Sequence, residues 1–180
     1  MQTNGSIKRL LMKSRNIYFS SFIVMILIVS GCASTTPLIK ASASGDYLSV
    51  KKLINEGTNI NEPDSNGATS LMHAIWKGKT EVAKYLIESG TYLKHKDKKG
   101  YNALFYAIEY GQLEIVKSLI DKGADLESKD SMDLTPLVYA ALYERDTDII
   151  KLLIERGANL NARTSEGETA LNILFSSKSD

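Results

Sequence analysis

The sequence predicts an all-α repeat solenoid, a stack of helix-turn-helix units, because one short pattern recurs along most of its 180 residues. Four glycines mark the repeat at nearly equal intervals: Gly57, Gly90, Gly123 and Gly157. An apolar Leu-Ile pair precedes each glycine, and a threonine or asparagine stands at a nearly constant distance before that pair. Residues 1–31 lack this pattern, which indicates that they serve a different purpose.

Residues 1–31 have the features of an export signal. Four basic side chains and no acidic one precede an apolar run that extends from Ile17 to Val29. A membrane-spanning helix needs about 20 apolar residues, so the run is short for an anchor and fits the apolar region of a signal peptide. We therefore predict a cleaved signal peptide over residues 1–31, with an uncleaved, tilted membrane helix as the alternative.

The only cysteine of the chain follows that segment directly. A single cysteine excludes an internal disulfide and a zinc site built from several thiolates. Val29-Ser30-Gly31-Cys32 resembles the lipobox of bacterial lipoproteins, in which an aliphatic residue and two small residues precede the lipidated cysteine. The resemblance implies that Cys32 is acylated, that residues 32–35 form a short tether, and that Ala33-Ser34 directs the protein to the outer membrane. An incidental apolar cysteine is the alternative.

Each repeat contains the signals that begin and end two helices. Thr36, Thr69, Asn102 and Thr135 are suited to cap the first helix, because their side-chain oxygens accept a free backbone N–H. In the second repeat Leu71, Ala74 and Ile75 fall on one helical arc, which should face the core, and the other repeats have equivalents. The glycines fit the left-handed position after the second helix. Asp133 replaces a glycine at a turn, where we expect a positive φ.

Two stretches relate this repeat to a known family. TPLVYA at 135–140 and GQLEIVKSLIDKGADLES at 111–128 resemble the ankyrin repeat, and the likeness extends from residue 36 to about 175. It implies an ankyrin stack over residues 36–180, with short β-hairpin fingers and four full repeats plus a C-terminal half repeat, at about 36–63, 64–96, 97–129, 130–163 and 164–180. The usual histidine of the T-P-L-H motif is absent from every copy, so we expect packing to replace its hydrogen bonds.

The sequence offers no catalytic motif, and we expect neither an enzyme, a cofactor nor a small-molecule substrate. Asp64-Ser65-Asn66-Gly67 is typical of a turn rather than a calcium loop, because no glutamate follows at the required spacing. Residues 94–99 form a basic run, which we interpret as a solvated finger; contact with an acidic partner or anionic head groups is an alternative. Residues 32–180 contain 18 basic and 21 acidic side chains, a charge of about −3, which argues against nucleic acid as a partner.

The ankyrin resemblance implies a protein partner bound on a concave face made of fingers and first helices. Large side chains outside the core arc, together with nearby lysines, are the candidates for this face. They are Trp76, Lys77, Lys98, Lys99, Tyr101, Tyr110, Met132, Leu134, Leu142 and Tyr143. Some of these aromatic side chains could instead pack sideways against a neighbouring finger.

The sequence therefore predicts a non-enzymatic, membrane-anchored protein-binding module of the bacterial cell envelope. We expect the lipid on Cys32 to hold it on the outer membrane, facing the periplasm. Some bacterial ankyrin lipoproteins resemble immunity proteins, so an inhibitor of a periplasmic toxin such as a lipase is the most specific interpretation. The alternative is an ankyrin effector secreted to bind host proteins, which lipidation in the envelope would oppose.

Overall fold

The structure is a computed structural model that describes residues 35–143 and 146–176. The chain separates into two compact units, residues 1–34 and 35–180, and every helix described below belongs to the second. The predictions of a signal peptide and of acylation at Cys32 lie outside the described residues. The fourth repeat has one residue more than the others in the turn at 143–147, which predicts an irregular conformation there. Residues 144 and 145, at the centre of this turn, also lie outside the described residues.

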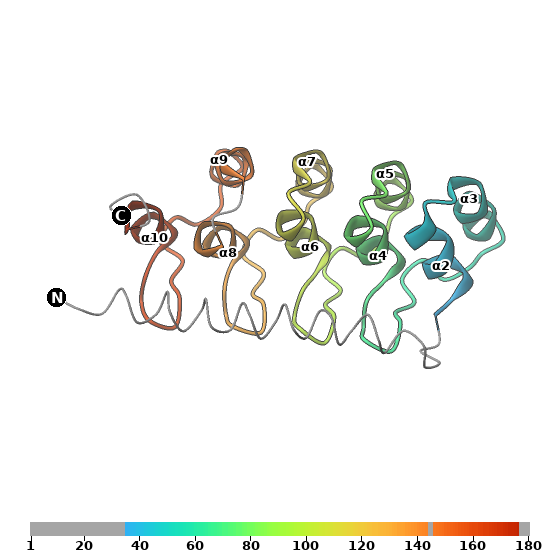
Figure 1. The fold of residues 1–180 in the computed structure, drawn as a ribbon, viewed down its shortest axis with the longest axis horizontal. Helices are drawn as coiled ribbons and strands as arrows, with labels where there is room; N and C mark the ends of the chain where they lie inside the picture. The colour runs from blue at the N-terminus through green and yellow to red at the C-terminus, as the bar shows by residue number, and fades with distance from the viewer. Residues whose placement is uncertain (1–34, 144–145, 177–180) are drawn as a thin grey trace. The chain divides into compact units, whose positions relative to one another are not determined.

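Nine helices form within the described residues, and eight of them make four helix pairs. The pairs are α2 (Pro37–Ser44) with α3 (Tyr47–Asn55), α4 (Ser70–Trp76) with α5 (Thr80–Glu88), α6 (Ala103–Glu109) with α7 (Leu113–Asp121), and α8 (Pro136–Leu142) with α9 (Thr147–Glu155). The ninth helix, α10 (Ala170–Ser176), packs against α8. The first helices form one row, the second helices form another, and looped fingers project from the first row (Figure 1). The all-α repeat solenoid is therefore confirmed.

The core lies between the stacked helices, where the sequence pattern placed it. Leu71, Ala74 and Ile75 of α4 are at most 1% exposed, and Leu104, Ala107 and Ile108 of α6 repeat that arrangement. The two helices of a pair, and the helices of neighbouring pairs, share these apolar surfaces. Stacking therefore stabilises each unit, since one helix pair alone would leave its apolar faces in water.

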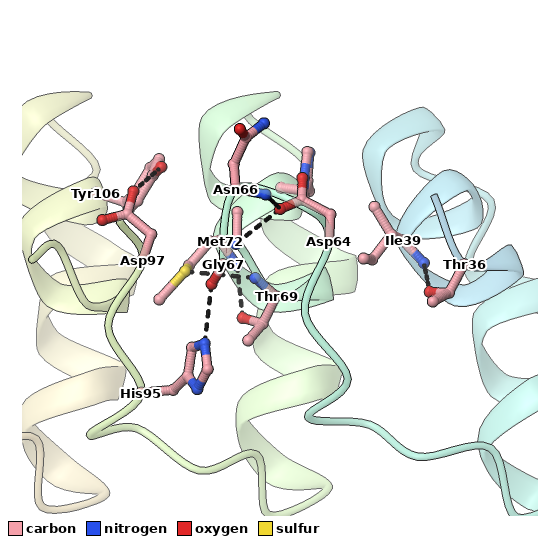
Figure 2. Close-up of polar contacts among 12 residues, drawn as sticks. Thr36, Ile39, Asp64, Asn66, Gly67, Thr69, Met72, His95, Asp97 and Tyr106 are labelled. Atoms are coloured by element: carbon pink, nitrogen blue, oxygen red, sulfur yellow. Dashed lines mark hydrogen bonds and ion pairs between the residues drawn. The ribbon is translucent and has the colours of Figure 1, made fainter. Parts of the chain in front are cut away.

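Three of the four predicted capping residues bind the helix N-terminus through their side chains. Thr36 Oγ1 accepts a hydrogen bond from the amide of Ile39 at 3.2 Å, and Thr69 caps α4 in the same way (Figure 2). The side chain of Asn102 caps α6. The prediction for Thr135 is wrong, because α8 has no side-chain cap and the buried Thr135 hydroxyl has no partner among the described atoms. Proline at the first helical position does not explain the difference, because Pro37 follows Thr36 in the same way and Thr36 still caps its helix.

Packing replaces the missing histidine of the repeat motif, as expected. Ile39, Phe105 and Val138 occupy its positions in three helix pairs, and each is 0% exposed. In α4 the equivalent residue is Met72, whose Sδ accepts a hydrogen bond from the amide of Thr69 at 3.4 Å (Figure 2). The motif therefore changes from a polar anchor to an apolar one.

The fingers are tight turns closed by a few hydrogen bonds. In the finger of the second repeat, the amide of Asp64 donates to the carbonyl of Ala68, and the amide of Gly67 donates to that of Asp64, each at 2.9 Å. Within the described residues the only β-bridge joins Arg163 to Thr169, so the fingers there have hairpin-like turns without extended strands. Asp133 has a φ of 60°, which confirms the left-handed conformation predicted for it.

Candidate binding face

The predicted partner-binding residues lie on the first helices and the fingers, with different degrees of exposure. Lys77, Lys98, Lys99, Tyr110 and Met132 are exposed. Four others are half-buried: Trp76, Tyr101, Leu142 and Tyr143. We call these nine residues, together with Tyr106, the first-helix face; Tyr139 is only 2% exposed and supports this face from the core.

Leu134 does not belong to this face, and its prediction needs correction. Its side chain is only 4% exposed and forms part of the hydrophobic core. Leu134 stands just before Thr135, the residue at the N-terminal boundary of α8, and an apolar side chain at that position typically folds onto its own helix. Its amide also donates to Asp130 Oδ1 at 2.9 Å, which holds the residue against the finger and away from any partner.

Five tyrosines make a continuous row along the first-helix face. Tyr110 packs on Tyr106 with ring centroids 6.4 Å apart, and Tyr106 lies 6.1 Å from Tyr101. Tyr101 lies 5.6 Å from Tyr139, which lies 4.6 Å from Tyr143. We call these five side chains the tyrosine row. It links α6 to α8, so it brings together Tyr101, Tyr110 and Tyr143, three of the residues that the sequence predicted for the binding face.

Two members of the row, Tyr106 and Tyr139, were not predicted from the sequence. Each stands nine residues after the aspartate of its own finger, as His73 stands nine residues after Asp64 in the second repeat. His73 Nε2 lies 2.9 Å from Asp64 Oδ2, and the Tyr106 hydroxyl donates to Asp97 Oδ2 at 2.8 Å (Figure 2). This recurring spacing between a finger aspartate and a polar aromatic ring was the available signal.

Tyr139 makes a different contact from its equivalents. Its hydroxyl donates to a carboxylate oxygen of Glu109 in α6 and accepts from the Tyr101 hydroxyl at 3.3 Å. Asp130, the aspartate of its own finger, is 6% exposed, and its Oδ2 has no hydrogen-bond partner among the described atoms. Tyr139 therefore ties one helix pair to the preceding one instead of closing its own finger.

The hydroxyls of Tyr101, Tyr106 and Tyr139 act as hydrogen-bond donors at neutral pH. Burial is the main cause that raises the pKa of Tyr101, Tyr106 and Tyr139. The nearby carboxylates of Asp97 and Glu109 raise the pKa of Tyr106 and Tyr139 further, since a phenolate would be repelled there. A partner therefore meets neutral rings held in place by hydrogen bonds.

Trp76 lies at the end of α4 with its ring engaged by two neighbours. The Nζ of Lys77 stands 3.8 Å from the centre of the Trp76 ring, a cation–π contact. The His73 ring lies 5.7 Å away on the same helix. Trp76 thus presents a large, half-buried aromatic ring beside a positive charge.

The fingers that present Lys98 and Lys99 are joined to their neighbours. The amide of Lys98 donates to the carbonyl of Asn66 at 3.0 Å, and the amide of Ser131 donates to the carbonyl of Lys99 at 3.3 Å. At Gly100 a side chain is excluded, since a Cβ there would lie 2.7 Å from the Ser131 nitrogen. The fingertips are therefore fixed before any partner arrives, which lowers the entropic cost of binding.

The described residues contain no cluster of three or more histidine, cysteine, aspartate or glutamate side chains able to hold a metal ion. In the same part of the chain, no helix has the length and apolar character needed to cross a membrane. The chemistry of the first-helix face is that of aromatic surface, hydroxyl donors and ammonium groups, which suits recognition of another macromolecule.

The sequence matches a model of one protein family. This model, described as ankyrin repeats (3 copies), matches residues 7–97, 38–130 and 89–164. Together these matches extend over most of the chain. No curated protein matches the sequence.

Proposed function

The chain belongs to the ankyrin-repeat family, whose repeats bind protein partners, and we propose that it is a non-enzymatic, lipid-anchored protein of the bacterial cell envelope. It binds one protein through the first-helix face. The observation that supports this most strongly is the tyrosine row, since Tyr110 at its end is 37% exposed although stacking of the repeats does not require it. Tyrosine and tryptophan are the residues that most often dominate the binding energy at protein interfaces.

The proposed anchor is the acyl group on Cys32. Its support is the sequence Val29-Ser30-Gly31-Cys32, together with the apolar run that precedes it. Helix α2 begins at Pro37, so the tether from Cys32 to the Thr36 cap reaches roughly 14 Å at full extension. Two or more acyl chains give stable membrane attachment, and one chain does not. A multiply acylated protein would therefore stay attached to a membrane, and Ala33-Ser34 after the cysteine favours the outer membrane, facing the periplasm.

An immunity-type inhibitor is the most specific form of this proposal. A short tether would keep the first-helix face near the bilayer, where a periplasmic toxin such as a lipase acts on its substrate. The proposed mechanism is occlusion of the toxin by the tyrosine row and Trp76. An effector that binds host proteins would need to leave the envelope, which an acylated N-terminus opposes.

Photo-crosslinking in a bacterial host tests this proposal. A photoreactive phenylalanine derivative replaces Tyr110 in the full-length chain, and the control carries it in place of Tyr47, which is 38% exposed on the second helix α3. We expect one envelope protein to crosslink at position 110 and not at position 47. Equal crosslinking at both positions, or none at position 110, would contradict a partner on the first-helix face.

A further inference from the structure

The finger of the third repeat, called the third finger, concentrates positive charge at the edge of the first-helix face. Residues 94–99 contain four lysines and one acid, Asp97, and all four lysines are exposed. The carboxylate of Asp97 faces inward. Its Oδ1 accepts from the amides of Lys99 and Tyr101, each at 2.9 Å, and its Oδ2 accepts from Tyr106. The third finger therefore uses its one acid internally and presents its ammonium groups to solvent.

The ammonium groups of the third finger are not balanced by acids in the part of the chain that the structure describes. There, no carboxylate lies within 4.0 Å of the Nζ of Lys94, Lys98 or Lys99. Lys96 donates to a backbone carbonyl, that of Lys129 at 2.6 Å, which leaves its charge uncompensated. The third finger is thus a local source of positive potential beside the tyrosine row.

Three cations of the second-helix row are instead paired with acids. Lys84 pairs with Glu114 at 2.5 Å and Arg156 pairs with Asp121 at 2.5 Å, each across neighbouring helix pairs. Lys151 pairs with Asp148 at 3.0 Å within α9. These cations of the second-helix row are therefore balanced by the fold itself, whereas those of the third finger are available to a partner.

We propose that the partner of the first-helix face is an acidic protein segment, in which an apolar side chain packs on the tyrosine row and flanking aspartates or glutamates meet Lys98 and Lys99. The inference rests on the proposed function and adds the chemistry of the partner. Residues 32–180 contain 18 basic and 21 acidic side chains, so attraction of an acidic segment depends on this finger and not on net charge.

An acidic protein fits this surface better than an anionic membrane. Lipid attraction grows with the number of lysines that reach one plane, and exposed acids oppose it. Glu62 is exposed in the loop before the third finger, and in the loop after it Asp133 balances Lys129, with Nζ and Oδ1 3.9 Å apart. The positive region is therefore confined to one finger, which suits a few carboxylates on a folded partner or peptide.

Selection from a random displayed peptide library on the full-length chain tests the proposal. We expect enriched peptides to contain an apolar residue flanked by aspartate or glutamate. Reversal of two charges, Lys98→Glu with Lys99→Glu, should weaken binding of those peptides by roughly tenfold or more and should shift selection toward lysine and arginine. The matched control, Lys117→Glu with Lys122→Glu on and after α7, makes the same change in net charge and should leave both results unchanged.

The outcomes separate this proposal from the one on which it rests. Peptides that lose binding with Tyr110→Ala but show no acidic enrichment would overturn the acidic partner while supporting the first-helix face. Peptides that do not depend on Tyr110 would contradict both. Acidic enrichment unaffected by the Lys98 and Lys99 reversal would also overturn the proposal. A membrane surface would replace the acidic partner under two conditions. The unmodified chain would select no acidic peptides, and the Lys98 and Lys99 reversal would abolish a preference for phosphatidylglycerol over phosphatidylcholine vesicles.

Discussion

The hydroxyl of Tyr139 donates to Glu109 in the preceding helix pair, although it stands at the spacing from which Tyr106 binds the aspartate of its own finger. At equivalent positions, the hydroxyl therefore closes a finger in the third repeat and joins two repeats in the fourth. The exchange leaves Asp130 Oδ2 without a partner among the described atoms. It also places the Tyr139 ring in the tyrosine row, between Tyr101 and Tyr143.

This difference predicts unequal effects of the same substitution. Among the described residues Tyr106 is the only donor to Asp97 Oδ2, and Asp97 is 9% exposed, so we expect Tyr106→Phe to lower the free energy of unfolding by about 1–3 kcal/mol. Tyr139→Phe removes the donor to Glu109 and the acceptor of the Tyr101 hydroxyl, but both partners are half-buried and can bind water instead, so we expect a loss of about 0.5–1 kcal/mol. Urea denaturation measures both. A greater loss for Tyr139→Phe would contradict this interpretation.

Thr135 and Thr36 provide a second matched pair, because each precedes a helix whose first residue is proline. The Thr36 hydroxyl caps α2, so Thr36→Val should lower the free energy of unfolding by about 1 kcal/mol. The buried Thr135 hydroxyl does not cap α8, so Thr135→Val should leave stability unchanged or raise it by up to about 1 kcal/mol. Thermal unfolding of the two variants decides this, and a clear loss with Thr135→Val would show that its hydroxyl has an unrecognised partner.

Gly100 should be far less tolerant of substitution than Gly123. Both have a positive φ, 78° and 83°, so alanine strains the backbone at either position by about 1–2 kcal/mol. At Gly100 the new methyl group would also meet the Ser131 nitrogen at 2.7 Å, whereas nothing lies within 4 Å at Gly123. We expect Gly100→Ala to cost about 2–4 kcal/mol in total. Equal melting temperatures for the two variants would mean that the fingertips do not need their close contact.

Acylation at Cys32 is tested by metabolic labelling with a palmitate analogue in a bacterial host. The full-length chain should incorporate the label and fractionate with membranes, and Cys32→Ser should do neither. The repeat unit should keep its melting temperature, because the buried core begins at Leu38. Ser34→Ala serves as the control and should remain labelled. Absence of label from the unmodified chain would contradict the proposed lipoprotein.

Much of the fold could be predicted from the sequence because it depends on local signals that recur. The capping residues at 36, 69 and 102, and the apolar arc of Leu71, Ala74 and Ile75, act within one helix or between adjacent equivalents. The left-handed Asp133 likewise reflects the geometry of a single turn. Such signals need no knowledge of how distant side chains meet.

The candidate face was less predictable because it depends on which of several nearby groups each side chain contacts. Sequence spacing treats Tyr139 as the equivalent of Tyr106, and only the three-dimensional structure shows that its hydroxyl binds Glu109. Leu134 was assigned to the surface because it follows a fingertip, yet it packs into the core at the start of α8. Helical periodicity, which identified the rest of the core, does not apply to a residue just outside a helix.

Tyr110→Ala is the decisive test of a protein partner on the first-helix face. The measurement is the dissociation constant of the full-length chain for the protein that crosslinks at position 110, with Tyr47→Ala as the control of the same residue type and similar exposure, 38% against 37%. We expect Tyr110→Ala to weaken binding roughly 30-fold or more without a change in melting temperature, and Tyr47→Ala to leave affinity unchanged. Unchanged affinity with Tyr110→Ala, or an equal loss with Tyr47→Ala, would contradict a partner on this face.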